Sequence, residues 1–118
     1  MGLHVAKFRF SGTPPSREEV NDRLRLEGGE LCTLSGSRRE GSDLVIYTSI
    51  SAYAPAYASK VLRGMGGIEI DYDTGEPVDE PLPEFVDKPW LEHDEVTRQR
   101  ILNAFQDEVD SWDPAKRK

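Results

Sequence analysis

The chain has 118 residues, a formal net charge of −7 and one cysteine. This length suits a single domain, which we assign to residues 1–118. Because Cys32 cannot form an internal disulfide, stability must come from packing, and we expect the reducing environment of the cytoplasm. No apolar window approaches the length needed to cross a bilayer, so we expect no membrane partner.

The negative charge is concentrated in the second half of the chain. Residues 1–67 carry nine Lys and Arg against seven Asp and Glu, whereas residues 68–118 carry six against fifteen. Between Asp71 and Glu95, ten acids accompany a single basic residue, Lys88. Such a surface repels phosphate backbones, and we therefore expect no nucleic-acid partner.

A strand and then a helix are predicted in the part of the chain before Gly28 and Gly29. Residues 3–10 alternate as a strand with one buried face, which consists of His4, Ala6, Phe8 and Phe10. Ser16 and Glu19 have the spacing of a capping box, in which each side chain satisfies a free backbone amide, so a helix is expected to begin there. Gly28 and Gly29 supply residues suited to its end.

The middle of the chain predicts a hairpin and a second helix. Residues 31–35 and 44–50 are expected as strands, joined by a flexible tip over residues 36–43. Pro55 fits the first turn of the following helix, since its missing amide costs nothing there. The buried face of that helix is expected to comprise Ala54, Tyr57, Ala58, Val61, Leu62 and Met65.

Residues 68–72 alternate apolar and acidic side chains. They predict a strand with Ile68, Ile70 and Tyr72 facing inward and an acidic outer face. The order β-α-β-β-α-β over residues 1–72 predicts an α+β fold of the ferredoxin-like, split β-α-β type. In that arrangement an antiparallel sheet carries both helices on one face.

The remainder of the chain divides into a connector and a helix. Residues 73–92 are acidic and rich in proline, which predicts an extended, solvated connector. Residues 93–113 carry an apolar helical stripe and predict a C-terminal helix. The outer face of the sheet has apolar positions such as Val5, which allow a cover formed by this helix or by a second protomer in a homodimer.

Motifs for catalysis and for cofactors are lacking in the sequence. Residues 71–76 share the alternating oxygen ligands of a calcium loop, but the glycine is the fifth residue and Leu82 occupies the twelfth position. Two isolated histidines and Cys32 do not form a zinc set, and there is no nucleophile elbow or phosphate loop. We therefore expect no catalytic residue, cofactor or metal.

The favoured hypothesis is a non-enzymatic, small acidic protein-interaction domain, such as an inhibitor or immunity-type protein that masks a basic surface of a protein partner. Tyr53 is included in the predicted binding site because it lacks an assigned packing role. The other predicted partner-binding residues are the acids Asp71, Asp73, Glu76, Asp79 and Glu80.

Two alternatives remain open. The first is a small ferredoxin-like enzyme or ligand-binding domain, oligomeric or not, with a cleft between the sheet and the connector. The polar groups of that cleft would come from Tyr53, Tyr57, Arg63 or His4. In the second alternative, the acidic run only keeps the protein soluble.

Overall fold

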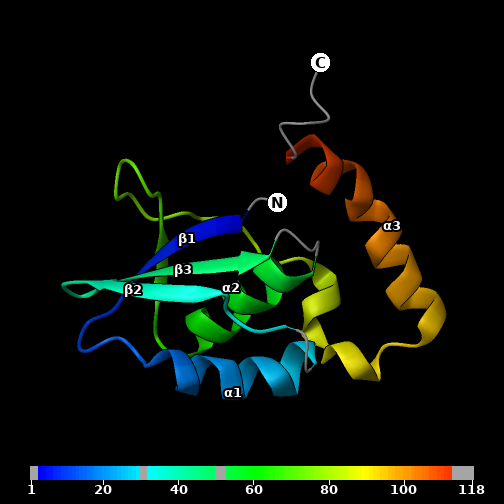
Figure 1. Ribbon diagram of the computed structural model, residues 1–118, viewed down its shortest axis with the longest axis horizontal. Coiled ribbons are helices and arrows are strands. Elements are labelled where there is room, and N and C mark those ends of the chain that lie inside the picture. The colour runs from blue at the N-terminus through cyan, green and yellow to red at the C-terminus, as the bar shows by residue number, and fades with distance from the viewer. Residues whose placement is uncertain (1–2, 30–31, 50–52, 113–118) are drawn as a thin grey trace.

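The computed structural model describes residues 3–29, 32–49 and 53–112. These residues form a four-stranded antiparallel sheet and three α-helices, which confirms the α+β class (Figure 1). The strands lie in the order β2-β3-β1-β4. The elements in chain order are β1 (Leu3–Arg9), α1 (Arg17–Gly28), β2 (Gly36–Glu40), β3 (Asp43–Ser49), α2 (Ala54–Gly64), β4 (Ile68–Ile70), the 3-10 helices η1 (Glu84–Asp87) and η2 (Trp90–Glu92), and α3 (Glu95–Trp112).

The main core lies between one face of the sheet and the helices α1 and α2. Both helices lie on the same side of the sheet (Figure 1). Phe8 of β1 is paired with Leu44 of β3, and both side chains are buried, so the predicted alternation in β1 is confirmed. The predicted buried face of α2 is also confirmed: Tyr57 and Leu62 are fully buried, and only Met65 at its end is partly exposed.

The start of α1 follows the predicted capping pair. The hydroxyl of Ser16 accepts a hydrogen bond from the backbone N–H of Glu19 at 3.2 Å and donates one to the Glu19 carboxylate at 3.3 Å. The helix then buries Val20 and Leu24. Gly29 follows its last residue with a φ of 88°, a conformation that glycine adopts without strain.

The second strand differs from the prediction. The described residues 32–35 are not a strand; the strand is β2, and a short turn containing Gly41 (φ 67°) joins it to β3. The apolar residues Cys32 and Leu34 are nevertheless buried in the core, and the Leu34 amide donates to Asn21 Oδ1 at 2.8 Å. Because β2 is an edge strand with an exposed end, it needs no apolar run of its own. Leu31 and Ile50, the ends of the two predicted strands, lie outside the described residues.

The orientation predicted for the last strand is wrong. Glu69, not its isoleucine neighbours, faces the helices, because it is paired with the core residue Phe8. Its carboxylate accepts hydrogen bonds from Ser59 at 2.7 Å and from Arg63 at 3.2 Å, so the polar margin of α2 satisfies it. Ile68 is 55% exposed on the outer face, and Ile70 lies on that face as well.

The last residue of α1 lies close to Cys32, and substitution of that residue tests this contact. A methyl group on Gly28 would lie 2.5 Å from Cys32 Sγ, whereas one on Gly64 would meet nothing within 4 Å. Each glycine is the last residue of its helix. We expect Gly28→Ala to lower the free energy of unfolding by about 1–3 kcal/mol through overpacking.

The matched control is Gly64→Ala, which should leave the free energy of unfolding unchanged or raise it by up to about 1 kcal/mol. Urea unfolding followed by circular dichroism measures both effects. Equal stability of the two variants would show that the end of α1 does not pack on Cys32.

Candidate functional site

The acidic turn, residues 71–76, is ordered by one of its own carboxylates. Oδ1 of Asp71 accepts the backbone N–H groups of Asp73 and Thr74, each at 2.9 Å, and these bonds lower the pKa of Asp71. Gly75 takes a φ of 75°, and a bridge between Ile70 and Pro77 closes the hairpin. Asp71 therefore shapes the turn, while the acids beyond it are free to face solvent.

A tyrosine attaches this turn to the outer face of the sheet. The Tyr72 hydroxyl accepts a hydrogen bond from Arg38 at 3.1 Å, and the ammonium of Lys7 lies 5.6 Å from the centre of its ring. Tyr72 was expected to face the core and instead lies on this outer face. The same face carries an ion-pair network that links Lys7 to Glu40 at 3.2 Å and to Asp43 at 3.8 Å.

The outer face thus combines these ion pairs with apolar side chains, which include Ile68 and the buried Ile70. Val45 is fully buried there, and Val5 is 42% exposed. The helix α3 lies beyond one end of the sheet and does not cover this face (Figure 1).

Four exposed acids lie in the acidic turn or shortly after it in the chain. The carboxylates of Asp73, Glu76, Asp79 and Glu80 form no hydrogen bond or ion pair with any residue that the structure describes. The backbone of Glu80 is fixed, since its carbonyl accepts a hydrogen bond from Arg63 at 2.8 Å. The acids are thus presented to solvent by a chain segment that is itself attached to the domain.

Acids elsewhere in the described part of the chain are mostly paired. Glu27 binds Lys60 at 2.8 Å and Asp43 binds Arg9 at 3.2 Å. Glu40 receives bonds from Lys7 and Arg38, which lower its pKa. In the stretch 84–95, in contrast, the exposed acids without a described side-chain partner are Glu84, Asp87, Glu92 and Glu95.

Part of the expected solvated connector is docked on the domain. Residues 84–93, which we call the strap, contain η1 and η2 and bury Val86 almost completely. The hydroxyl of Tyr57 donates to the carbonyl oxygen of Lys88 at 2.8 Å, and burial raises the pKa of Tyr57. Trp90 stacks on Tyr53 with ring centres 4.2 Å apart and planes 10° apart.

The end of the strap leads directly into α3. His93 Nε2 lies 2.7 Å from the carbonyl oxygen of Phe85, which joins the two ends of the strap. The next residue, Asp94, accepts the amide of Thr97 at 2.6 Å and so caps α3, as its pKa below the usual range reflects. The strap therefore fixes where the C-terminal helix starts.

The predicted binding residues fall into two groups. Asp71, Asp73 and Glu76 share the acidic turn, and Asp79 and Glu80 follow it closely in the chain. Tyr53 lies elsewhere, at the start of α2 under Trp90, and the turn and the strap occupy different parts of the molecule (Figure 1). The stacking gives Tyr53 the packing role that the sequence did not reveal.

Cys32 is buried with 1% exposure. Burial raises the pKa of its thiol to about 12, so the thiolate needed for nucleophilic chemistry does not form near neutral pH. Among the residues that the structure describes, no three His, Cys, Asp or Glu side chains form a group that could hold a metal ion.

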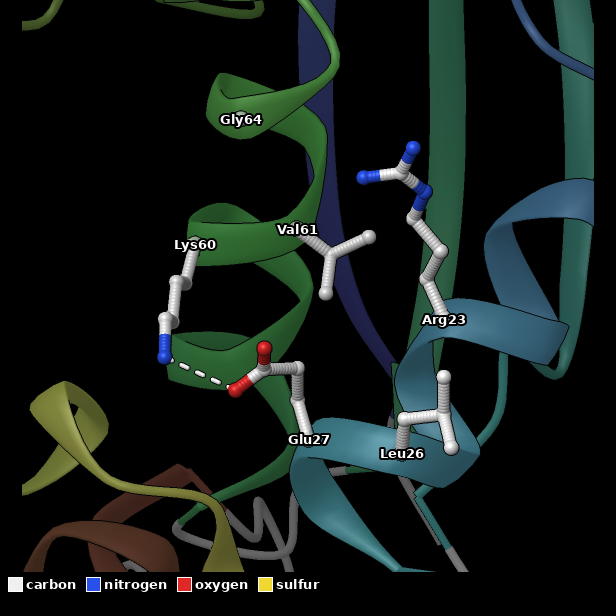
Figure 2. Close-up of a pocket in the computed structure, with 6 residues that line it drawn as sticks. All are labelled: Arg23, Leu26, Glu27, Lys60, Val61 and Gly64. Carbon is white, nitrogen blue, oxygen red and sulfur yellow. Dashed lines mark hydrogen bonds and ion pairs between the residues drawn. The ribbon is translucent and has the colours of Figure 1, made fainter.

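An open groove lies between α1 and α2, on a different part of the molecule from the predicted cleft (Figure 2). Its volume is about 250 Å³. None of the residues proposed for a cleft between sheet and connector lines it: Tyr53 and Tyr57 belong to the aromatic cluster under the strap, and Arg63 is engaged by Glu69. The groove is lined by Arg23, Leu26, Glu27, Lys60, Val61 and Gly64.

Comparisons with protein-family models, with curated proteins and with solved structures find no match to this chain. None of the helices in the described residues combines the length and the apolar character needed to span a membrane.

The stacking of Tyr53 on Trp90 can be tested with a double-mutant cycle. We expect Tyr53→Ala and Trp90→Ala each to destabilise the protein, with a coupling energy of about 1 kcal/mol, as is typical of an aromatic pair. Chemical unfolding of the two single variants and the double variant measures it. Additive effects of the two substitutions would contradict the stacked geometry.

Proposed function

We propose that this chain is a non-enzymatic protein-interaction domain whose acidic surface masks a basic region of a protein partner, in the manner of an inhibitor or immunity-type protein. The observation that supports this proposal most is the exposure, without partners among the described residues, of the carboxylates of Asp73, Glu76, Asp79 and Glu80. The partner-binding site comprises these four acids together with Asp71, which shapes the turn.

The ordered turn supports a binding role over a purely solubilising one. A disordered acidic tail is sufficient for solubility, whereas Asp71 uses two backbone hydrogen bonds to hold this turn in one shape. Fixed charges lose less conformational entropy on binding than mobile ones. A concentrated negative field also accelerates the encounter with a cationic partner.

Tyr53 takes a secondary place in this proposal. Its ring is stacked beneath Trp90, so it supports the strap that carries further acids and does not touch the acidic turn. The free thiol of Cys32 supports a cytoplasmic location. The exposed outer-face residues Val5 and Ile68 support a homodimer through the sheet.

We assign the ferredoxin-like arrangement as the finer description of the fold. The chain order of the strands and of the first two helices, together with the strand order β2-β3-β1-β4, supports it. This assignment carries no activity with it, because folds of this kind serve many unrelated functions.

Charge reversal tests the proposed surface. The quadruple variant has Asp73, Glu76, Asp79 and Glu80 changed to Lys, and we expect it to bind the partner about tenfold more weakly or worse. The full-length wild-type chain serves as bait in a cell extract, and the affinity of each captured protein for the wild type and the variant is then measured at low and high salt. Binding to the wild type should weaken as salt rises, because exposed charges are screened.

Two double variants of equal charge change provide the control. Asp73→Lys with Glu76→Lys alters the proposed surface, whereas Glu18→Lys with Asp22→Lys alters exposed acids of α1. Only the first pair should reduce binding. Equal losses from both pairs would reveal a general charge effect and would remove the support for a specific site; unchanged binding of the quadruple variant would overturn the proposal.

A further inference from the structure

The groove between α1 and α2 combines an apolar wall with charged rims. Val61 of α2 is almost completely buried at its base, and Leu26 of α1 stands beside it with 79% of its surface exposed. A leucine this exposed on a helix is a poor contributor to the core, but it supplies apolar contact area to anything that enters the groove.

The charges along the groove do not cancel. Glu27 and Lys60 neutralise each other across it through a 2.8 Å ion pair. The guanidinium of Arg23 forms no hydrogen bond or ion pair with any described residue, and it extends along the groove toward the Gly64 end (Figure 2). In a chain with a net charge of −7, the groove thus retains one uncompensated positive charge.

From this arrangement we infer that the groove binds a small amphipathic carboxylate. The carboxylate of this ligand binds the guanidinium of Arg23, because a guanidinium donates two parallel hydrogen bonds to the two oxygens of a carboxylate. Its apolar chain lies on Leu26 and Val61. This inference goes beyond the proposed function, since the acidic surface does not line the groove.

The dimensions of the groove limit the ligand. Its volume is about 250 Å³. That is less than the volume of sites for drug-sized molecules, which begin at about 300 Å³. A short monocarboxylate fits this volume. Gly64 leaves one end of the groove open, because a Cβ there would meet nothing within 4 Å.

Titration of the full-length, ¹⁵N-labelled chain with hexanoate tests the inference by NMR. We expect saturable shifts of the amides of Leu26, Val61 and Gly64, with a dissociation constant of about 1 mM. Hexanol, which has the same chain length and no charge, should bind more weakly. Equal binding of hexanol, or shifts that lie outside the groove, would overturn the inference.

Substitutions separate the contribution of each groove residue. Arg23→Gln should weaken hexanoate binding about fivefold, as expected for an exposed ion pair. Arg17→Gln removes another exposed arginine of α1 that does not line the groove and should leave binding unchanged. Gly64→Leu should abolish binding by filling the open end.

Tight binding of hexanoate to Arg23→Gln would contradict the assignment even if Gly64→Leu failed to fold. Shifts of the groove amides on dilution of the protein without hexanoate would also contradict it, because they would place a second copy of the chain in the groove. Either result is independent of the charge-reversal experiment on the acidic surface.

Discussion

The hydrogen bond from the Tyr57 hydroxyl to the Lys88 carbonyl is the contact on which the arrangement of the second half of the chain depends. The Tyr57 side chain is fully buried in the core, so the position of its hydroxyl is fixed by the packing of α2 on the sheet. Through this bond, the strap is held against the domain, and Trp90 is placed over Tyr53. The same hydroxyl lies 3.4 Å from the carbonyl oxygen of Phe85, so both carbonyl oxygens belong to the strap. Without the strap, this buried hydroxyl would lose both acceptors, which is unfavourable.

The attachment of the second half of the chain also gives its unpaired acids a defined arrangement. The sheet and the first two helices pair many of their acids with nearby cations, as in the contacts of Glu69 with Arg63 and of Glu27 with Lys60. The segment after β4 has one lysine among ten acids over residues 71–95, so internal pairing is not available to it. Since the turn and the strap are fixed to the domain, the unpaired carboxylates form a surface of defined shape. The proposed function assigns a cationic partner to that surface.

Patterns among neighbouring residues predicted those parts of the fold that depend on interactions between neighbouring residues. The alternation around Phe8 identified β1, the spacing of Ser16 and Glu19 identified the start of α1, and Pro55 marked the start of α2. The acids of the turn could be recognised as exposed because they occur in polar, proline-rich sequence. Each of these features depends on residues within a few positions of one another.

The remaining features depend on contacts between distant residues. The apolar pair Cys32 and Leu34 suggested a strand, although it fills the core from a loop. Glu69 faces the helices through its pairing with Phe8, and Ser59 and Arg63 of another element satisfy its carboxylate there. Nothing near Trp90 in the sequence indicates that it stacks on Tyr53.

The groove was missed for the same kind of reason. The exposure of Leu26 and the direction of Arg23 follow from the packing of α1 beside α2, and no spacing within either helix shows them. In the sequence, the groove is indicated only by Leu26, an apolar residue of α1 that does not belong to the buried pair Val20 and Leu24.

Backbone ¹⁵N relaxation shows whether the strap is held against the domain by the Tyr57 hydroxyl or behaves as a free linker. If the strap is held in this way, residues 84–93 should have order parameters of about 0.85, comparable to those of α2. Order parameters below about 0.6 in these residues, with α2 remaining rigid, would contradict it.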